Sequence, residues 1–216
     1  MNYSAGIIRD CGTNLKTSLS FKVDSWESIP PSISIDNFLS DEEIDKLVYY
    51  CQENGKFGQG GVGSDGGKSV VNTEIRDSEI KFFRFNSDTS WIFKKIKSVI
   101  EKINDECYNF DLVGFDRFQY AEYNHDGSKY DVHMDCFLGK KDVNLIRKLS
   151  LSLLLSDPEK DFDGGKLEIS TSQFRDTKQK KGTIVLFPSF ILHRVTPVTR
   201  GNRKSIVVWV LGPKFK

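Results

Sequence analysis

Hydrophobic residues recur with a helical period in two stretches of the first half of the chain. The first follows a short apolar strand at 33–35; Ser40 and Glu43 form a capping-box pattern at its start, and Gly55 ends it. Its apolar face consists of Ile44, Leu47 and Val48. The second covers about 90–106, and its apolar face consists of Ile92, Ile96, Val99, Ile100 and Ile103. Both stretches predict amphipathic helices.

The helical period disappears after residue 110, where short apolar segments alternate with Gly, Pro and Asp. The predicted strands cover 111–123, 149–155, 165–170, 182–187 and 203–211. Helices followed by a run of strands indicate an α+β chain whose second half is a sandwich or barrel. Residues 1–31 end at two prolines, and we expect them to form an extension, packed as an edge or partly mobile, before one domain at 32–216.

The composition is that of an ordinary globular protein, with 38% hydrophobic and 28% charged residues among 216. A net charge of +1 gives no electrostatic footprint for nucleic acid. The four cysteines are far apart and form no CxxC motif, which argues against a zinc ribbon and fits a reducing compartment. No apolar run resembles a signal peptide or approaches membrane length. We therefore expect a soluble cytoplasmic protein with no nucleic-acid or membrane partner, whereas its oligomeric state is not predicted.

The segment FGQGGVGSDGGKS, residues 57–69, is rich in glycine. It contains the pattern GxGxxG, but after a helix, where a dinucleotide site needs a preceding strand. It also approaches a P-loop, but Val62 occupies the place of the first glycine. The segment therefore predicts a flexible loop, and 57–75 could form a mobile lid over a site.

The stretch KYDVHMDCF places His133 two residues before Asp135. On a strand the two side chains share one face, with Met134 on the other. A third metal ligand must come from the remaining histidines. His125 lies in a loop by composition, whereas His193 opens an apolar segment, so we choose His193. Two imidazoles and one carboxylate leave coordination positions open and suit non-haem Fe(II); the alternative is a polar pair on a solvated face.

Arg203 follows His193 by ten residues, and its guanidinium can bind a carboxylate with two parallel hydrogen bonds. On a strand it would share one face with Ser205, Val207 and Trp209. Gln119, Ala121 and Tyr123 share a face by the same parity, and Tyr123 could donate a hydrogen bond to a small acid. The alternatives are a surface arginine and ordinary core packing of the aromatic residues.

Three segments together resemble the Fe(II)/2-oxoglutarate dioxygenases of the prolyl 4-hydroxylase group, especially bacterial and phage hydroxylases. They are QYAEYNHDGSKYDVHMD, LSLLLSDPEKDFDGGKLEI and KGTIVLFPSFILHRVTPVTRGNRKSIVVW, within about 115–211. The stretch ISIDNFLSDEEIDKL also resembles the start of that catalytic domain. The resemblance implies a double-stranded β-helix (jelly-roll) core with supporting N-terminal helices.

The resemblance also implies roles for individual residues. His133, Asp135 and His193 match the iron ligands, and Arg203 matches the basic residue that pairs with the distal carboxylate of 2-oxoglutarate. Leu154 stands where some relatives have a second tyrosine, so the distal carboxylate would depend on Arg203 with Ser205. The other implied pocket residues are Tyr123 and Trp209. The implied cofactors are Fe(II), 2-oxoglutarate as cosubstrate and O2, with ascorbate as a further candidate.

In this family 2-oxoglutarate is decarboxylated to succinate while an unactivated C–H bond is hydroxylated. The resemblance favours a prolyl residue in a protein or peptide as substrate; the same chemistry on a free amino acid or other small molecule is the alternative. A non-catalytic metal-binding β-barrel, acting as a sensor or binding module, would not need Arg203. Four arginines are candidate substrate contacts, but we interpret each as a solvated surface residue; they are Arg76, Arg84, Arg117 and Arg147.

Overall fold

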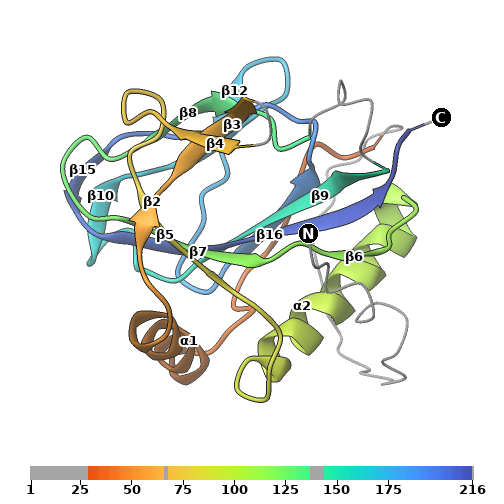
Figure 1. Cartoon of the computed structure of the whole chain (residues 1–216), viewed down its shortest axis with the longest axis horizontal. Helices are drawn as coiled ribbons and strands as arrows, with labels where there is room; N and C mark the ends of the chain where they lie inside the picture. Colours follow the sequence, from red (N-terminus) through yellow and green to blue (C-terminus); the bar gives the residue numbers. More distant parts are fainter. Residues whose placement is uncertain (1–28, 66–67, 137–143, 216) are drawn as a thin grey trace.

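The computed structural model describes residues 29–65, 68–136 and 144–215, which form strands with two helices (Figure 1). The first half contains β1 (Ile33–Ile35), α1 (Asp41–Glu53), β2 (Gly58–Gln59), β3 (Gly61–Asp65), β4 (Lys68–Val71), β5 (Glu79–Phe83), α2 (Ser90–Ile103) and a π-helical turn (Asn104–Tyr108). The second half contains β6 (Gly114–Phe115), β7 (Phe118–Tyr123), β8 (Tyr130–His133), β9 (Leu145–Leu154), β10 (Phe162–Gly164), β11 (Leu167–Ser170), β12 (Phe174–Asp176), β13 (Ile184–Pro188), β14 (His193–Val195), β15 (Val198–Gly201) and β16 (Arg203–Pro213).

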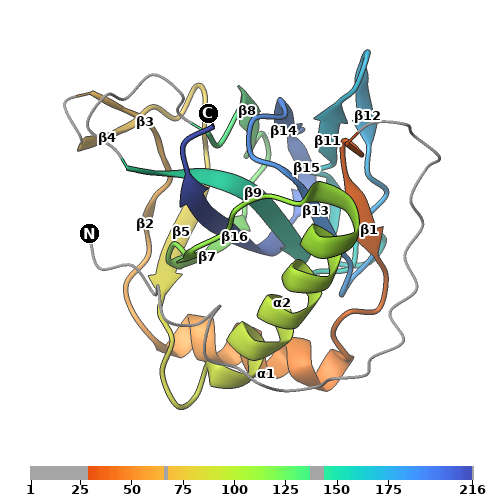
Figure 2. The ribbon, with the colours of Figure 1, turned by 90° about the vertical axis from the view of Figure 1, so that its right-hand side faces the viewer.

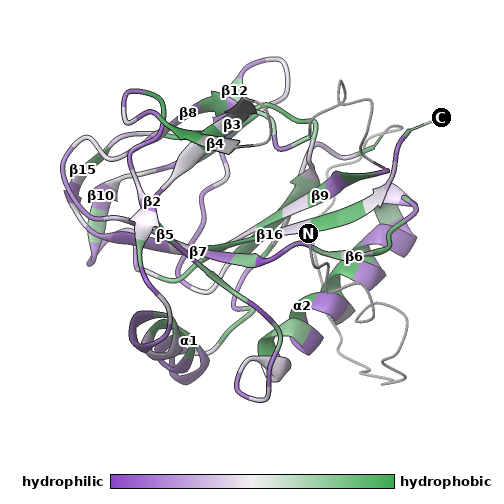
Figure 3. Ribbon diagram, in the orientation of Figure 1, coloured by the Kyte–Doolittle hydropathy of each residue, from purple (hydrophilic) through white to green (hydrophobic). Residues whose placement is uncertain are grey.

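Both predicted helices are confirmed. At the start of α1 the amide of Glu43 donates to Ser40 Oγ (3.3 Å) and the amide of Ser40 donates to Glu43 Oε2 (3.0 Å). This reciprocal capping box fixes the first turn. Hydrophilic and hydrophobic residues alternate around α2 (Figure 3), because its apolar face is buried.

The larger sheet has the strand order β1-β13-β9-β16-β7-β5-β2, with β6 paired to β16. One face of it packs against α1 and α2 (Figure 2). The main hydrophobic core lies there, because inward residues of the sheet and the helices belong to one buried cluster; its members include Ile92, Phe93, Leu151, Leu153 and Val208.

The smaller sheet has the order β12-β11-β14-β8 and lies on the side of the larger sheet away from the helices (Figure 2). The two sheets form a double-stranded β-helix, or jelly roll, with the helices as support. The predicted fold is therefore confirmed. The space between the sheets contains the residues of the candidate site.

The predicted strands differ from the observed ones mainly at their ends. The segment 111–123 is divided into β6 and β7, and β9 begins at Leu145, earlier than predicted. The glycine-rich segment is not a plain loop, because β3 and β4 pair as a hairpin. No helix follows it before β5, so both nucleotide-binding interpretations lose their structural context.

Residues 1–28 lie outside the described part of the chain, so the proposed boundary of the extension at residue 31 stays a prediction. Within the described residues, no helix is both long and apolar enough to cross a membrane.

Candidate active site

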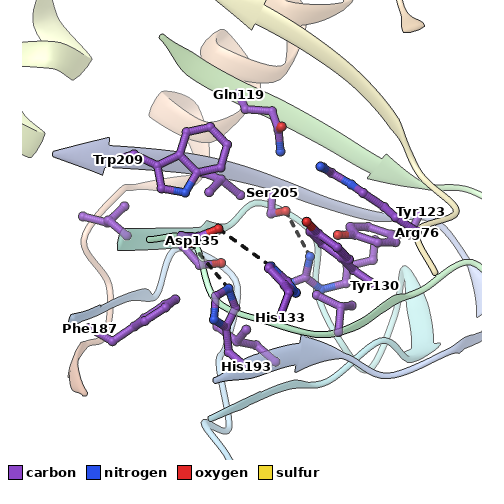
Figure 4. A pocket seen from close by; sticks show the side chains of 16 residues that line it. Arg76, Gln119, Tyr123, Tyr130, His133, Asp135, Phe187, His193, Ser205 and Trp209 are labelled. Carbon is purple, nitrogen blue, oxygen red and sulfur yellow. Dashed lines mark hydrogen bonds and ion pairs between the residues drawn. The ribbon is translucent and has the colours of Figure 1, made fainter. Parts of the chain in front are cut away.

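His133, Asp135 and His193 meet at the edge of the smaller sheet. His133 ends β8 and His193 begins β14, and the two histidines face each other in the antiparallel register of these strands. His133 Nε2 lies 3.7 Å from Asp135 Oδ1, and His193 Nε2 lies 3.5 Å from Asp135 Oδ2. One ligand atom from each residue lies within 4.8 Å of the others, and Figure 4 shows the three side chains pointing toward one another.

The local explanation for this arrangement needs one correction. Asp135 does not lie on the strand with His133, since β8 ends at His133 and Asp135 is in a bend. The bend is held because the amides of Asp135 and Cys136 both donate to the carbonyl of Ser189 (2.9 and 3.0 Å). Met134 is 41% exposed and does not line the pocket that contains the three side chains.

His125, the rejected third ligand, lies apart from this group. Its Nε2 is 3.2 Å from Asp77 Oδ2, and its side chain is 55% exposed. Within the described residues, the cluster able to hold a metal consists of the other two histidines and Asp135.

The hydrogen bonds of the two imidazoles leave the correct nitrogen for a metal. His133 Nδ1 lies 2.8 Å from the carbonyl of Asp131, and His193 Nδ1 lies 2.9 Å from the carbonyl of Ile191. A carbonyl only accepts, so each Nδ1 carries the proton and each Nε2 presents its lone pair to the centre of the site.

The surroundings of the site keep His133 neutral and the carboxylate of Asp135 charged. Burial, and then the neighbouring His193, lower the pKa of His133 to about 3. Burial alone would raise the pKa of Asp135, but the two imidazoles, Arg147 and Ser150 lower it to about 2. At neutral pH the group therefore offers one carboxylate and an unprotonated His133 imidazole, which fit a divalent cation.

Arg203 is a buried cation on the first residue of β16, with 2% of its surface exposed. It donates from NH1 to Ser205 Oγ (3.0 Å), while its Nε has no hydrogen-bond partner in the part of the chain that the structure describes. No carboxylate among the described residues forms an ion pair with it, and burial lowers the pKa of its guanidinium. Because a buried unpaired charge is costly, this arrangement fits an anionic ligand bound at Arg203.

One pocket contains the cluster and the predicted cosubstrate residues. Its lining includes Arg203, Ser205, Val207 and Trp209, so the predicted common face of this strand is confirmed. Tyr123 also lines it, with its ring centre 5.4 Å from the Arg203 guanidinium. Leu154 pairs with Ser205 in the larger sheet and is buried.

Sequence reasoning did not find a stack of three side chains beside the cluster. The Tyr130 ring lies on the imidazole of His133 with 3.5 Å between centroids, and the Arg76 guanidinium lies 4.4 Å from the Tyr130 ring on its other side. Arg76 is only 5% exposed, so its interpretation as a solvated residue is wrong. Strand parity gave no signal for this stack, because residues three apart on a regular strand point to opposite faces, and Tyr130 meets His133 where the pairing of β8 with β14 shifts its register.

Comparison with protein families supports this site. Residues 118–211, somewhat less than half of the chain, match the model of the family described as the 2OG-Fe(II) oxygenase superfamily. The chain is 45% identical over 87 residues to a PKHD-type hydroxylase of Hyphomonas neptunium and 41% identical over 88 residues to one of Teredinibacter turnerae. Each match covers 39% of this chain and 38% of the relative, so the chain matches well under half of the length of these relatives.

Solved structures extend the similarity to most of the fold. A prolyl 4-hydroxylase of Pseudomonas putida superposes with a TM-score of 0.66 and 20% identity, over 86% of this chain and 94% of that one. A viral collagen prolyl hydroxylase from Paramecium Bursaria Chlorella virus-1, solved with 2OG, gives 0.64 and 25%, over 84% and 96%. The fold is thus that of the prolyl 4-hydroxylase-like group, and the resemblance read from the sequence is confirmed.

Proposed function

We propose that this protein is an Fe(II)- and 2-oxoglutarate-dependent oxygenase that hydroxylates an unactivated C–H bond on a prolyl residue of a protein or peptide. The observation that carries the proposal is one pocket with two kinds of unsatisfied group. His133, Asp135 and His193 present three metal-ligand atoms, and Arg203 is a buried cation that has no carboxylate partner among the described residues. A metal-binding module without turnover would have no use for the second feature.

Each of these side chains has a distinct task in the proposed reaction. His133, Asp135 and His193 would hold the iron through Nε2, a carboxylate oxygen and Nε2. Arg203, with Ser205, would pair with the distal carboxylate of 2-oxoglutarate and so orient its other end toward the metal. When bound, the metal and cosubstrate supply oxygen activation coupled to decarboxylation.

The pocket walls support the same task. Trp209 and Phe187 line it, and the buried Trp209 Nε1 has no hydrogen-bond partner among residues 29–65, 68–136 and 144–215. Aromatic walls exclude water from the reacting atoms and leave Trp209 able to donate to a bound ligand. Tyr123 would close the side of the pocket next to Arg203.

Prolyl peptide substrates are proposed here because the solved neighbours include prolyl hydroxylases, one of them solved with a hypoxia inducible factor peptide fragment. Gln59, Gly61 and Gly63 of the glycine-rich segment line a groove that also contains Asp135, which supports a substrate-covering role for this segment. A free amino acid remains the competing substrate class. The expected cytoplasmic location stays a prediction.

An anaerobic titration of the metal-free protein with Fe(II) and 2-oxoglutarate tests the proposal. We expect a visible charge-transfer band that needs both components and is absent in Asp135→Ala. His125→Ala should retain the band, since His125 lies apart from the cluster. If the folded protein binds Fe(II) but gives no band with 2-oxoglutarate, the non-catalytic metal-binding module becomes the favoured interpretation.

A further inference from the structure

A second groove opens beside the pocket of the metal-ligand cluster. It is lined by Gln59, Gly61 and Gly63 of the glycine-rich segment, by Phe82 of β5, and by Arg117 and Arg147, among others. The groove and the pocket share Arg76, Gln119, Tyr130, Asp135 and Trp209. A molecule lying in the groove would therefore reach the cluster at Asp135.

The groove carries an excess of positive charge. Three arginines line it, whereas Asp135, the proposed metal ligand, is the one carboxylate among its described lining residues. Each arginine lies over an aromatic ring, at distances of 4.4, 4.2 and 3.7 Å from guanidinium carbon to ring centre; the pairs are Arg76 with Tyr130, Arg117 with Phe82, and Arg147 with Trp209. Such stacking fixes the plane of a guanidinium and leaves its N–H groups directed sideways.

The three arginines differ in how far their charge is already used. Arg147 forms an ion pair with Asp116 Oδ2 (3.1 Å). Arg76 donates to Ser78 Oγ and to the carbonyl of Gly61 (3.0 and 3.2 Å). Arg117 is exposed, and its guanidinium forms no hydrogen bond or ion pair with a described residue. Among the described residues, the guanidinium interacts with the ring of Phe82, through the cation–π stack.

We propose that the groove binds a peptide carrying an acidic residue close to the target residue, and that Arg117, which lies over the Phe82 ring, pairs with that carboxylate. This inference rests on the proposed oxygenase function and names the substrate class of the same site. A carboxylate matches the guanidinium fork, and the half-exposed Phe82 ring offers apolar surface beside it. Because Arg117 is exposed, the pairing should weaken with salt.

The test uses the Fe(II)-loaded protein with 2-oxoglutarate and two pools of peptides with a central proline. In one pool the flanking positions are neutral; in the other they include Asp and Glu. Succinate release is measured for the wild type, for Arg117→Gln, and for Arg200→Gln, a matched loss of one charge from an exposed arginine outside both the pocket and the groove. Free Asp, Glu, Asn and Gln form a third set of probes.

We expect the acidic pool to exceed the neutral pool in the wild type and in Arg200→Gln, and Arg117→Gln to reduce kcat/KM for the acidic pool about fivefold, as an exposed ion pair allows. Equal rates with both pools, or a preference that persists in Arg117→Gln, would overturn the inference. Stimulation by free Asp and Glu but by neither pool would overturn the peptide in favour of a small acid. The charge-transfer band distinguishes failure of the acidic-peptide inference from failure of the proposed oxygenase function. If the band forms and neither pool is used, the inference fails alone. If the band does not form, the proposed function fails as well.

Discussion

Ser150 donates its hydroxyl proton to Oδ2 of Asp135 over 2.7 Å, and both residues are buried. Because a hydroxyl has one proton, Ser150 must accept the hydrogen bond that links it to Ser189 Oγ at 2.8 Å. The carbonyl of Ser189 accepts the amide of Asp135 as well. Ser150 of β9 and Ser189, in the turn that follows β13, thus fix the carboxylate before any metal binds, a role that outer-shell groups commonly have at metal sites.

Ser150→Ala should therefore weaken Fe(II) binding without unfolding the protein. The carboxylate loses a hydrogen bond that orients it, and we expect about tenfold lower affinity for Fe(II), the lower end for loss of an outer-shell partner. Competition with a metal-sensitive dye would measure it. Ser150→Thr retains the hydroxyl and should stay within about twofold of the wild type. Unchanged affinity in the alanine variant would show that Ser189 and the main chain hold Asp135 without help.

Arg203→Met should separate cosubstrate binding from metal binding. The substitution retains an apolar stem and removes the only buried guanidinium that the proposal assigns to the distal carboxylate. Loss of a buried charged hydrogen bond costs about 3 kcal/mol, so 2-oxoglutarate should bind on the order of a hundredfold more weakly. Fe(II) affinity should not change. Arg200→Met is the control, and equal 2-oxoglutarate affinity in both variants would remove Arg203 from its proposed role.

The stability of the metal-free protein should fall between pH 7 and pH 5. His133 binds a proton near pH 6.5 in the unfolded chain but only near pH 3 in the folded one, so acid favours unfolding across this interval. The difference corresponds to about 2 kcal/mol between pH 7 and pH 5. Urea unfolding at both pH values measures it. The His133→Gln variant should lose most of this pH dependence of stability, and His125→Gln should retain it. If stability falls equally between pH 7 and pH 5 in the wild type and in His133→Gln, the pH dependence does not come from His133.

The fold and the inner site could be predicted because their signals are local. Helix period, capping at Ser40 and the alternation along the strand that begins at Arg203 depend on neighbours in the sequence. The strand parity that placed Ser205 and Trp209 beside Arg203 is equally local. The position of Asp135 beside His133 was predicted from strand alternation, which is an incomplete reason. The carbonyl of Ser189, a residue far away in the sequence, holds the bend that turns the Asp135 side chain inward.

The outer parts of the site depend on contacts that no local pattern encodes. Arg76 is buried because the glycine-rich segment and Tyr130 enclose it, and Ser150 meets Asp135 only after two sheets have packed. The strands β2 and β14, of two and three residues, are too short to show a period. Tertiary pairing alone creates them, which is why the glycine-rich hairpin was expected to be a loop.

Gly201→Ala should destabilise the protein and also weaken the cosubstrate site. Gly201 has φ of 79°, which costs a residue with a side chain about 1 kcal/mol, and a methyl group there would collide with the carbonyl oxygen of Asp161 and lie 3.0 Å from the Cα of Phe162. Since those atoms belong to the backbone of the paired segment, relief requires a shift of the chain next to Arg203.

The matched control is Gly55→Ala, because Gly55 has a similar φ of 76° but no atom within 4 Å of the added methyl group. We expect a loss of about 1 kcal/mol in the free energy of unfolding for Gly55→Ala and about 3 kcal/mol for Gly201→Ala, measured by urea titration. Only Gly201→Ala should also reduce 2-oxoglutarate affinity, since it alone lies beside β16. Equal losses of stability in the two variants would show that backbone conformation, and not the close approach to Asp161, determines the requirement for glycine.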